Sequence, residues 1–69
     1  MVEVYKTNVH KMKISEKVIS KFSKKFPTLK VNFDLDDCDK IMRVEGENFC
    51  PHKVKSIVKR MGYKCKLLK

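Results

Sequence analysis

The sequence predicts an α+β domain whose elements follow the order strand, helix, strand, strand, helix, strand. Apolar and polar residues alternate over residues 29–35, which is typical of a strand with one buried face. Apolar residues recur at helical spacing over residues 14–26 and again over 54–61. Shorter alternating segments at residues 2–8 and 64–68 complete the pattern.

The first strand is expected over residues 2–8, where Val2 and Val4 alternate with charged or aromatic neighbours. A helix is expected next, because the apolar residues that follow fall on one stripe. The stripe consists of Ile14, Val18, Ile19, Phe22 and Phe26. Ser15 is expected to cap the start of this helix with its hydroxyl. Pro27 is expected to end it, because the residue before a proline is pushed out of helical geometry.

A hairpin is expected in the middle of the chain. Its first strand has its apolar side chains at Leu29, Val31, Phe33 and Leu35. The aspartate-rich residues 36–40 interrupt this alternation and are expected to form the turn. Met42 and Val44 then continue as the partner strand.

The second helix has clear start and stop signals. Pro51 suits the first helical position, which places Cys50 at the N-cap. Gly62 is expected to close the helix in a left-handed conformation. The buried stripe consists of Val54, Ile57, Val58 and Met61. A short last strand follows, with Cys65 and Leu67 on one face, and Cys65 is expected to be a core residue.

The order βαββαβ with short connections predicts a ferredoxin-like sandwich. Both helices are expected to cover one face of a four-stranded antiparallel sheet. Residues 1–69 are expected to form a single domain. A domain of this size buries only about 60% of the surface that its unfolded chain exposes, so its core has to be compact.

Cysteine use and hydropathy predict a cytoplasmic location. The three cysteines are scattered and odd in number, which argues against a disulfide framework and for reduced thiols. No apolar run approaches the about 20 residues of a membrane helix, and the first residues lack the apolar core of a signal peptide. A membrane partner is therefore not expected.

The net charge of +9 is unevenly distributed. Residues 11–25 hold six lysines and one acid, and residues 53–66 hold six basic residues and no acid. A basic helical face is expected to attract an acidic protein or a second copy of the chain. This face comprises Lys17, Lys21, Lys24, Lys25, Lys55, Lys59 and Arg60. The alternative is that these side chains form solvated helix surfaces without a partner.

Nucleic acid is not the expected partner, although RNA-recognition modules share this topology. Those modules stack bases on aromatic residues of the central strands. Here the first strand offers Tyr5 and the third strand offers no aromatic residue. Lysines on the helices would hold a phosphate backbone without sequence preference.

The segment RVEGENFCPHKVKSIVKRMGYKCKLL, residues 43–68, resembles the second half of heavy-metal-associated (HMA) domains. This family includes small copper chaperones and the N-terminal modules of metal-pumping ATPases. The matching positions are Gly46, Pro51, Val54, Val58, Gly62, Tyr63 and Leu67. The segment KKFPTLKVNFDL, residues 24–35, is similar to the family's helix end and second strand. The resemblance covers nearly the whole chain and implies the fold, because none of these residues performs chemistry.

The same resemblance implies a copper(I) or zinc site in the loop before the first helix, where the family has the motif Met-x-Cys-x-x-Cys. Thiolates are the soft ligands that these ions prefer. Counting back from Pro27 places the cysteine positions near Met12 and Ser15, and residues 1–37 contain no cysteine. The function that the resemblance implies is metal binding or transport with a lost or remodelled site. The alternative is metal-independent docking through the basic face.

A remodelled metal site would draw on soft ligands that the topology brings to one end of the sandwich. The candidates are His10, Met12 and Cys38, with Tyr63 as a neighbour of the metal loop by resemblance. The flanking Asp36, Asp37 and Asp39 would add negative charge that favours a cation. The competing interpretation is an exposed histidine, an exposed or buried methionine and a turn cysteine that bind nothing.

Cys50 is a candidate reactive thiol, because it stands beside His52 at the start of the second helix. A helix N-terminus and nearby lysines favour the thiolate. The competing interpretation is a capping or half-buried cysteine. No catalytic triad, paired-carboxylate cleft or glycine-rich phosphate loop is present in the sequence, so no enzymatic activity is expected.

Overall fold

The computed structural model describes residues 1–36 and 38–68, and over these residues the chain forms six elements in the predicted order. They are β1 (Val2–Thr7), α1 (Met12–Lys25), β2 (Lys30–Asp34), β3 (Ile41–Glu45), α2 (Pro51–Arg60) and β4 (Cys65–Leu68). The α+β class and the element order are therefore confirmed.

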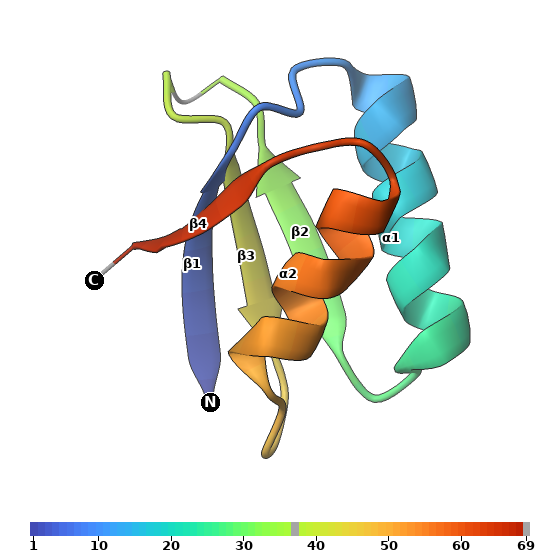
Figure 1. Cartoon of the computed structure of the whole chain (residues 1–69). Helices are drawn as coiled ribbons and strands as arrows, with labels where there is room; N and C mark the ends of the chain where they lie inside the picture. Colours follow the sequence, from blue (N-terminus) through green and yellow to red (C-terminus); the bar gives the residue numbers. More distant parts are fainter. Residues whose placement is uncertain (37, 69) are drawn as a thin grey trace.

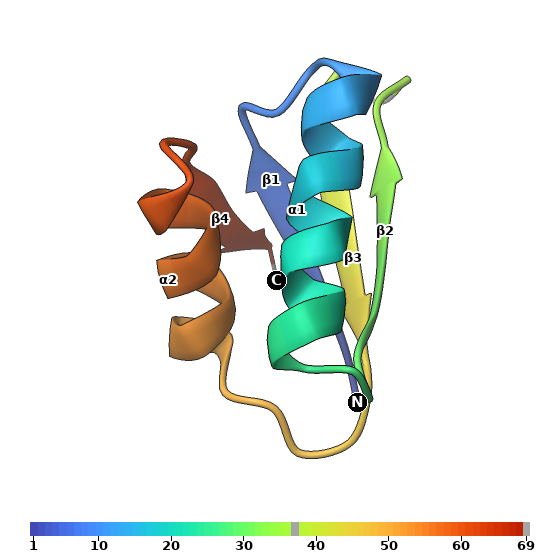
Figure 2. The same cartoon turned by 90° about the vertical axis from the view of Figure 1, so that its right-hand side faces the viewer.

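The strands form an antiparallel sheet in the order β2-β3-β1-β4. Figures 1 and 2 show α1 and α2 packed side by side on one face of this sheet. The predicted ferredoxin-like sandwich is confirmed. The order also makes β4 an edge strand that pairs with β1 on one side.

The core lies between the helices and the sheet. Val18 and Phe22 from α1, and Val54 and Val58 from α2, are almost completely buried. Burying a side chain of this kind contributes roughly 1.5–3 kcal/mol to folding. The strands supply Tyr5, Val31, Met42 and Val44 to the same cluster.

β1 buries Tyr5 and Thr7 rather than the valines that mark the strand in the sequence; Val2 is 43% exposed. Tyr5 lies opposite Met42 on β3 and Leu67 on β4, at the centre of the sheet. A tyrosine ring buries more apolar surface than a valine, so burying the face with Tyr5 is more stable than burying the face with the valines. Tyr5 is therefore not accessible to a stacking base.

α1 begins at Met12, and the prediction that Ser15 caps it is wrong. The backbone N–H groups of Ile14 and Ser15 both donate to the carbonyl of Lys11, so the first turn forms before Ser15. The Ser15 hydroxyl donates to the Met12 carbonyl at 2.7 Å. A serine inside a helix commonly bonds back to its own preceding turn in this way. The helix ends at Lys25, as expected from Pro27.

Both ends of α2 match the prediction. Cys50 is the N-cap residue and Pro51 opens the helix. Gly62 has a φ of +93°, which a residue with a Cβ rarely adopts. Its N–H donates to the Lys59 carbonyl, and the N–H of Tyr63 donates to the Val58 carbonyl, so the helix ends in a hydrogen-bonded turn.

Candidate functional site

Hydrogen bonds from the end of β1 hold three connections together at one end of the molecule. The Thr7 N–H donates to the Asp39 and Lys40 carbonyls in the β2–β3 turn, and the Thr7 hydroxyl donates to the Lys40 carbonyl at 2.7 Å. Asn8 accepts from the Lys64 N–H at 2.8 Å through its side-chain oxygen. Its own N–H donates to the Lys64 carbonyl. The β1–α1 loop, the β2–β3 turn and the α2–β4 connection therefore share one end, as Figures 1 and 2 also show.

The candidate metal ligands are solvent-accessible at this end. His10 is exposed, with its Nδ1 3.2 Å from the Asn8 carbonyl. Met12 is 71% exposed at the first turn of α1. Cys38 is an exposed free thiol in the β2–β3 turn.

Clusters of histidine, cysteine and carboxylate ligands are a separate question from the set that includes Met12. Within residues 1–36 and 38–68, no group of three or more His, Cys, Asp or Glu side chains is arranged to hold a metal ion. Ser15, near the second cysteine position of the family motif, is buried with its hydroxyl already bonded. Asp39 pairs with Lys6 at 3.4 Å, Asp36 is exposed, and Asp37 lies outside the described residues.

Cys50 and His52 line different hollows. Cys50 is an exposed free thiol beside a hollow of about 170 Å³ that also includes Phe49 and Lys53. His52 lines a larger groove on another side of α2. The imidazole is therefore not placed with Cys50 in a common pocket.

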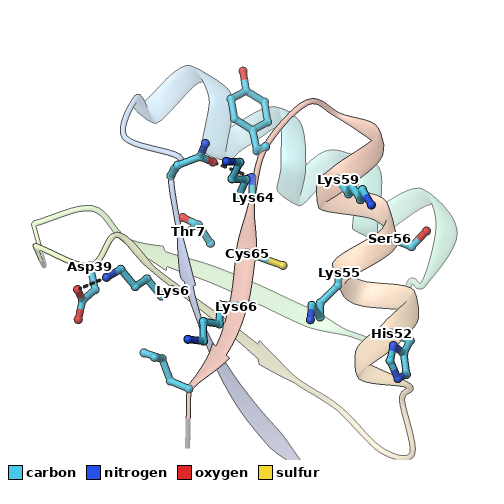
Figure 3. Close-up of a pocket in the computed structure, with 13 residues that line it drawn as sticks. Lys6, Thr7, Asp39, His52, Lys55, Ser56, Lys59, Lys64, Cys65 and Lys66 are labelled. Atoms are coloured by element: carbon cyan, nitrogen blue, oxygen red, sulfur yellow. Dashed lines mark hydrogen bonds and ion pairs between the residues drawn. The ribbon is translucent and has the colours of Figure 1, made fainter.

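The larger groove, about 970 Å³, runs along β4, with α2 on one side and the end of β1 and the β2–β3 turn on the other (Figure 3). We call it the β4–α2 groove. The lysines that line it are Lys6, Lys55, Lys59, Lys64 and Lys66. Asp39 is the one acid among the described lining residues, and it pairs with Lys6. The groove is thus a concentration of positive charge.

The α2 wall of the groove follows a helical stripe. It consists of His52, Lys55, Ser56 and Lys59, at positions i, i+3, i+4 and i+7. This spacing is visible in the sequence and could have indicated a shared face. The contribution of β4 comes from its pairing with β1 at the edge of the sheet, which the spacing of residues along α2 does not show.

Cys65 lies between the core and the β4–α2 groove. It is half-buried, packs against the core cluster and also lines the groove. Burial raises the pKa of the Cys65 thiol, and the nearby Lys55 ammonium opposes this shift. The neutral thiol is therefore favoured, which suits a packing role. Tyr63 is half-buried and contributes to the same groove.

The predicted basic face is distributed over separate surfaces. Lys55 and Lys59 line the β4–α2 groove, whereas Lys25 and Arg60 line a hollow of about 270 Å³ between the helices. Lys17, Lys21 and Lys24 are exposed along α1. The two hollows share Ser56, so the basic residues of α2 border both of them.

The fold and the arrangement of its loops define a ferredoxin-like sandwich. The structure is similar to the N-terminal domain of PacS from Synechocystis PCC6803, with a TM-score of 0.72 over 100% of this chain and 98% of that chain. The sequences are 16% identical, so this similarity concerns the fold. No model of a protein family and no curated protein matches the chain. Over the described residues, neither helix has the length and apolar character needed to cross a bilayer.

Proposed function

We propose that this chain is a protein-binding domain on an HMA-like scaffold that docks an acidic partner through its basic surfaces. The observation that carries the proposal is the unpaired positive charge of the β4–α2 groove. Among the described residues, Lys55, Lys59, Lys64 and Lys66 have no ion-pair partner. An acidic protein would supply the missing counter-charges.

Such a surface acts mainly on the rate and selectivity of association. Clustered charge of one sign steers an oppositely charged partner toward the surface and disfavours partners of like charge. Exposed charges are screened over about 10 Å at 0.1 M salt, so binding should weaken as salt is added. The free thiols at positions 38, 50 and 65 fit a reducing compartment, and we place the protein in the cytoplasm.

The test is binding of fluorescently labelled polyglutamate to the reduced chain, measured by anisotropy at low and high salt. Two double variants distinguish the surfaces. Lys55→Glu with Lys59→Glu tests the β4–α2 groove, and Lys17→Glu with Lys21→Glu tests the exposed face of α1. Lys30→Glu, on the far edge strand, is a single-substitution control for a change of charge away from both surfaces. Salt-sensitive binding that falls in a double variant supports docking by that surface. Absence of binding at low salt contradicts the proposal.

A remodelled soft-metal site is the second candidate function. It is favoured by the hydrogen bonds from Thr7 to Asp39 and Lys40, which hold the turn containing Cys38 at the same end as the loop of His10 and Met12. Imidazole, thioether and thiolate are all ligands for copper(I), and imidazole and thiolate are ligands for zinc. Here the metal would be cargo or a structural ion.

Anaerobic titration of the reduced protein with copper(I), and then zinc, against a competing chelator tests this candidate. The variants are His10→Ala, Met12→Leu and Cys38→Ser, and Cys50→Ser is the matched thiol control. One tight equivalent that is lost in the first set and retained in Cys50→Ser supports a remodelled site. Binding no tighter than that of an unstructured thiol peptide rules it out.

A further inference from the structure

We propose that the β4–α2 groove binds an extended acidic segment of a partner protein, which adds to the sheet as a strand beside β4. The inference rests on the proposed function, since the partner is acidic, and it names the surface and the mode of docking. It requires backbone groups at the edge of β4 and positive charge on both sides of the incoming strand.

The backbone of β4 supplies the first requirement. The Asn8 N–H donates to the Lys64 carbonyl, so these opposite residues form a hydrogen-bonded pair. In antiparallel ladders such pairs alternate, so Lys66 and Leu68 also bond to β1, whereas the backbone groups of Cys65 and Leu67 point away from it. Those outward N–H and C=O groups are a template for another strand.

The lysines supply the second requirement. Lys66 on β4 lies on the sheet face opposite to the one that carries Tyr5 and Leu67. Its neighbour on β1, Lys6, pairs with Asp39, so Lys66 supplies the free charge on this face. Lys55 and Lys59 project from α2 on the helix side of the same groove, as Figure 3 shows. Side chains of an added strand alternate between these two sides. Acidic residues would therefore be bound on both faces of the segment.

Protection of a bare edge does not account for this arrangement. Lysines on an edge strand do deter unwanted strand pairing, and Lys64 and Lys66 fit that role. Lys55 and Lys59 are on the helix and are not needed for it. Together with Lys66 they concentrate like charges around one groove, and none of the three has an ion-pair partner among the described residues. Such self-repulsion is relieved when an anionic partner binds.

A peptide fits this groove better than a nucleic acid does. The outward groups of Cys65 and Leu67 need backbone donors and acceptors that repeat at strand spacing, which a peptide provides. Nucleic acid gains much of its affinity for such modules from aromatic stacking, and Tyr5 is fully buried. The half-buried Cys65 and Leu68 add apolar contact along the groove.

The experiment uses the reduced full chain and a fluorescent peptide in which pairs of glutamates alternate with pairs of valines, so that both faces of the extended strand carry acid. Binding is measured by anisotropy, and amide exchange is followed by NMR. The matched control peptide has the same sequence with N-methyl groups on successive amides, which removes backbone donors along both edges of the strand and keeps the charge. A single-stranded DNA oligonucleotide of equal charge and inorganic phosphate are the other probes.

We expect the glutamate peptide to bind the wild type. N-methylation of the peptide should lower its affinity by at least about tenfold, and so should the variant Lys55→Glu with Lys59→Glu. Exchange of the Cys65 and Leu67 amides should slow in the complex, whereas the Lys66 amide, already bonded to β1, should change little. The variant Lys17→Glu with Lys21→Glu should bind as the wild type does. Amide spectra of the free variants establish that they are folded.

Equal binding of the N-methylated peptide, or tighter binding of DNA or phosphate, overturns strand addition. Strand addition is also overturned if the variant Lys17→Glu with Lys21→Glu loses binding while the variant Lys55→Glu with Lys59→Glu keeps it. That result would still support docking of an acidic partner through α1. Failure of polyglutamate and of both peptides to bind at low salt overturns this inference together with the proposed function.

Discussion

The hydroxyl of Tyr5 is a buried polar group that the fold leaves unsatisfied. The side chain is 0% exposed, and its oxygen has no hydrogen-bond partner among the described residues. A buried hydroxyl in this state costs about 1–3 kcal/mol. Tyr5→Phe removes the oxygen and keeps the ring, so we expect the free energy of unfolding to rise by about 1–2 kcal/mol at neutral pH. Each kcal/mol raises the Tm of a domain this small by about 4–8 °C.

The same residue predicts a loss of stability at alkaline pH. Burial, with smaller effects of Glu3, Cys65 and Cys50, raises the pKa of Tyr5 to about 12 from 10.0. Above pH 10 the unfolded chain releases this proton while the folded chain keeps it, so stability falls as pH rises. The full effect of two pKa units is about 3 kcal/mol, reached above pH 12. Tyr5→Phe lacks this contribution, and its advantage should grow between neutral pH and about pH 11.

The assay is urea unfolding of reduced protein, followed by far-UV circular dichroism at both pH values. Tyr63→Phe is the matched control. Tyr63 is only half-buried, and among the described residues its hydroxyl is not a buried group without a hydrogen-bond partner. The reasoning is refuted if the free energy of unfolding of Tyr5→Phe is lower than that of the wild type by about 1 kcal/mol or more. That result would mean that the hydroxyl makes a favourable hydrogen bond in solution.

Three further changes test how the elements are held. Thr7→Val leaves the Lys40 carbonyl and the Val9 N–H without the threonine hydroxyl, so it should cost about 1–3 kcal/mol in urea unfolding, whereas Thr7→Ser should cost less; equal losses contradict the bridging role. Gly62→Ala should cost about 1–2 kcal/mol through its positive φ alone, since a Cβ there meets no atom within 4 Å of the described structure; an unchanged Tm contradicts this. Val58→Ala, in the core, should cost about 2–3 kcal/mol, and a loss below about 0.5 kcal/mol means that the site collapses without a cavity.

Local patterns in the sequence were sufficient for most elements. The alternation over residues 29–35 and the stripe through Val54 and Val58 reflect burial of one face, and burial has the same period in any fold that uses the element. Pro51 and Gly62 act through their own backbone restrictions, so their positions mark the ends of α2 without knowledge of its neighbours.

One local prediction failed and the buried face of β1 was not predicted, because more than one interaction was available in each case. Ser15 can cap a helix or bond back within one, and the turn that forms on the Lys11 carbonyl selects the second option. β1 presents valines on one face and Tyr5 on the other, and neither alternation is decisive in isolation. The partners Met42 and Leu67 come from β3 and β4, and they determine which face is buried.

The sequence by itself determined the ferredoxin-like order, the absence of a cysteine from the loop before α1 and the excess of positive charge. Those properties depend on residue type and short spacing. Only the tertiary structure decided that Lys55 and Lys59 on α2 lie across a groove from Lys66, and that Cys65 and Leu67 turn their backbone groups outward. Both facts follow from β4 pairing with β1 at the edge of the sheet, a contact between segments about 60 residues apart that no local pattern encodes.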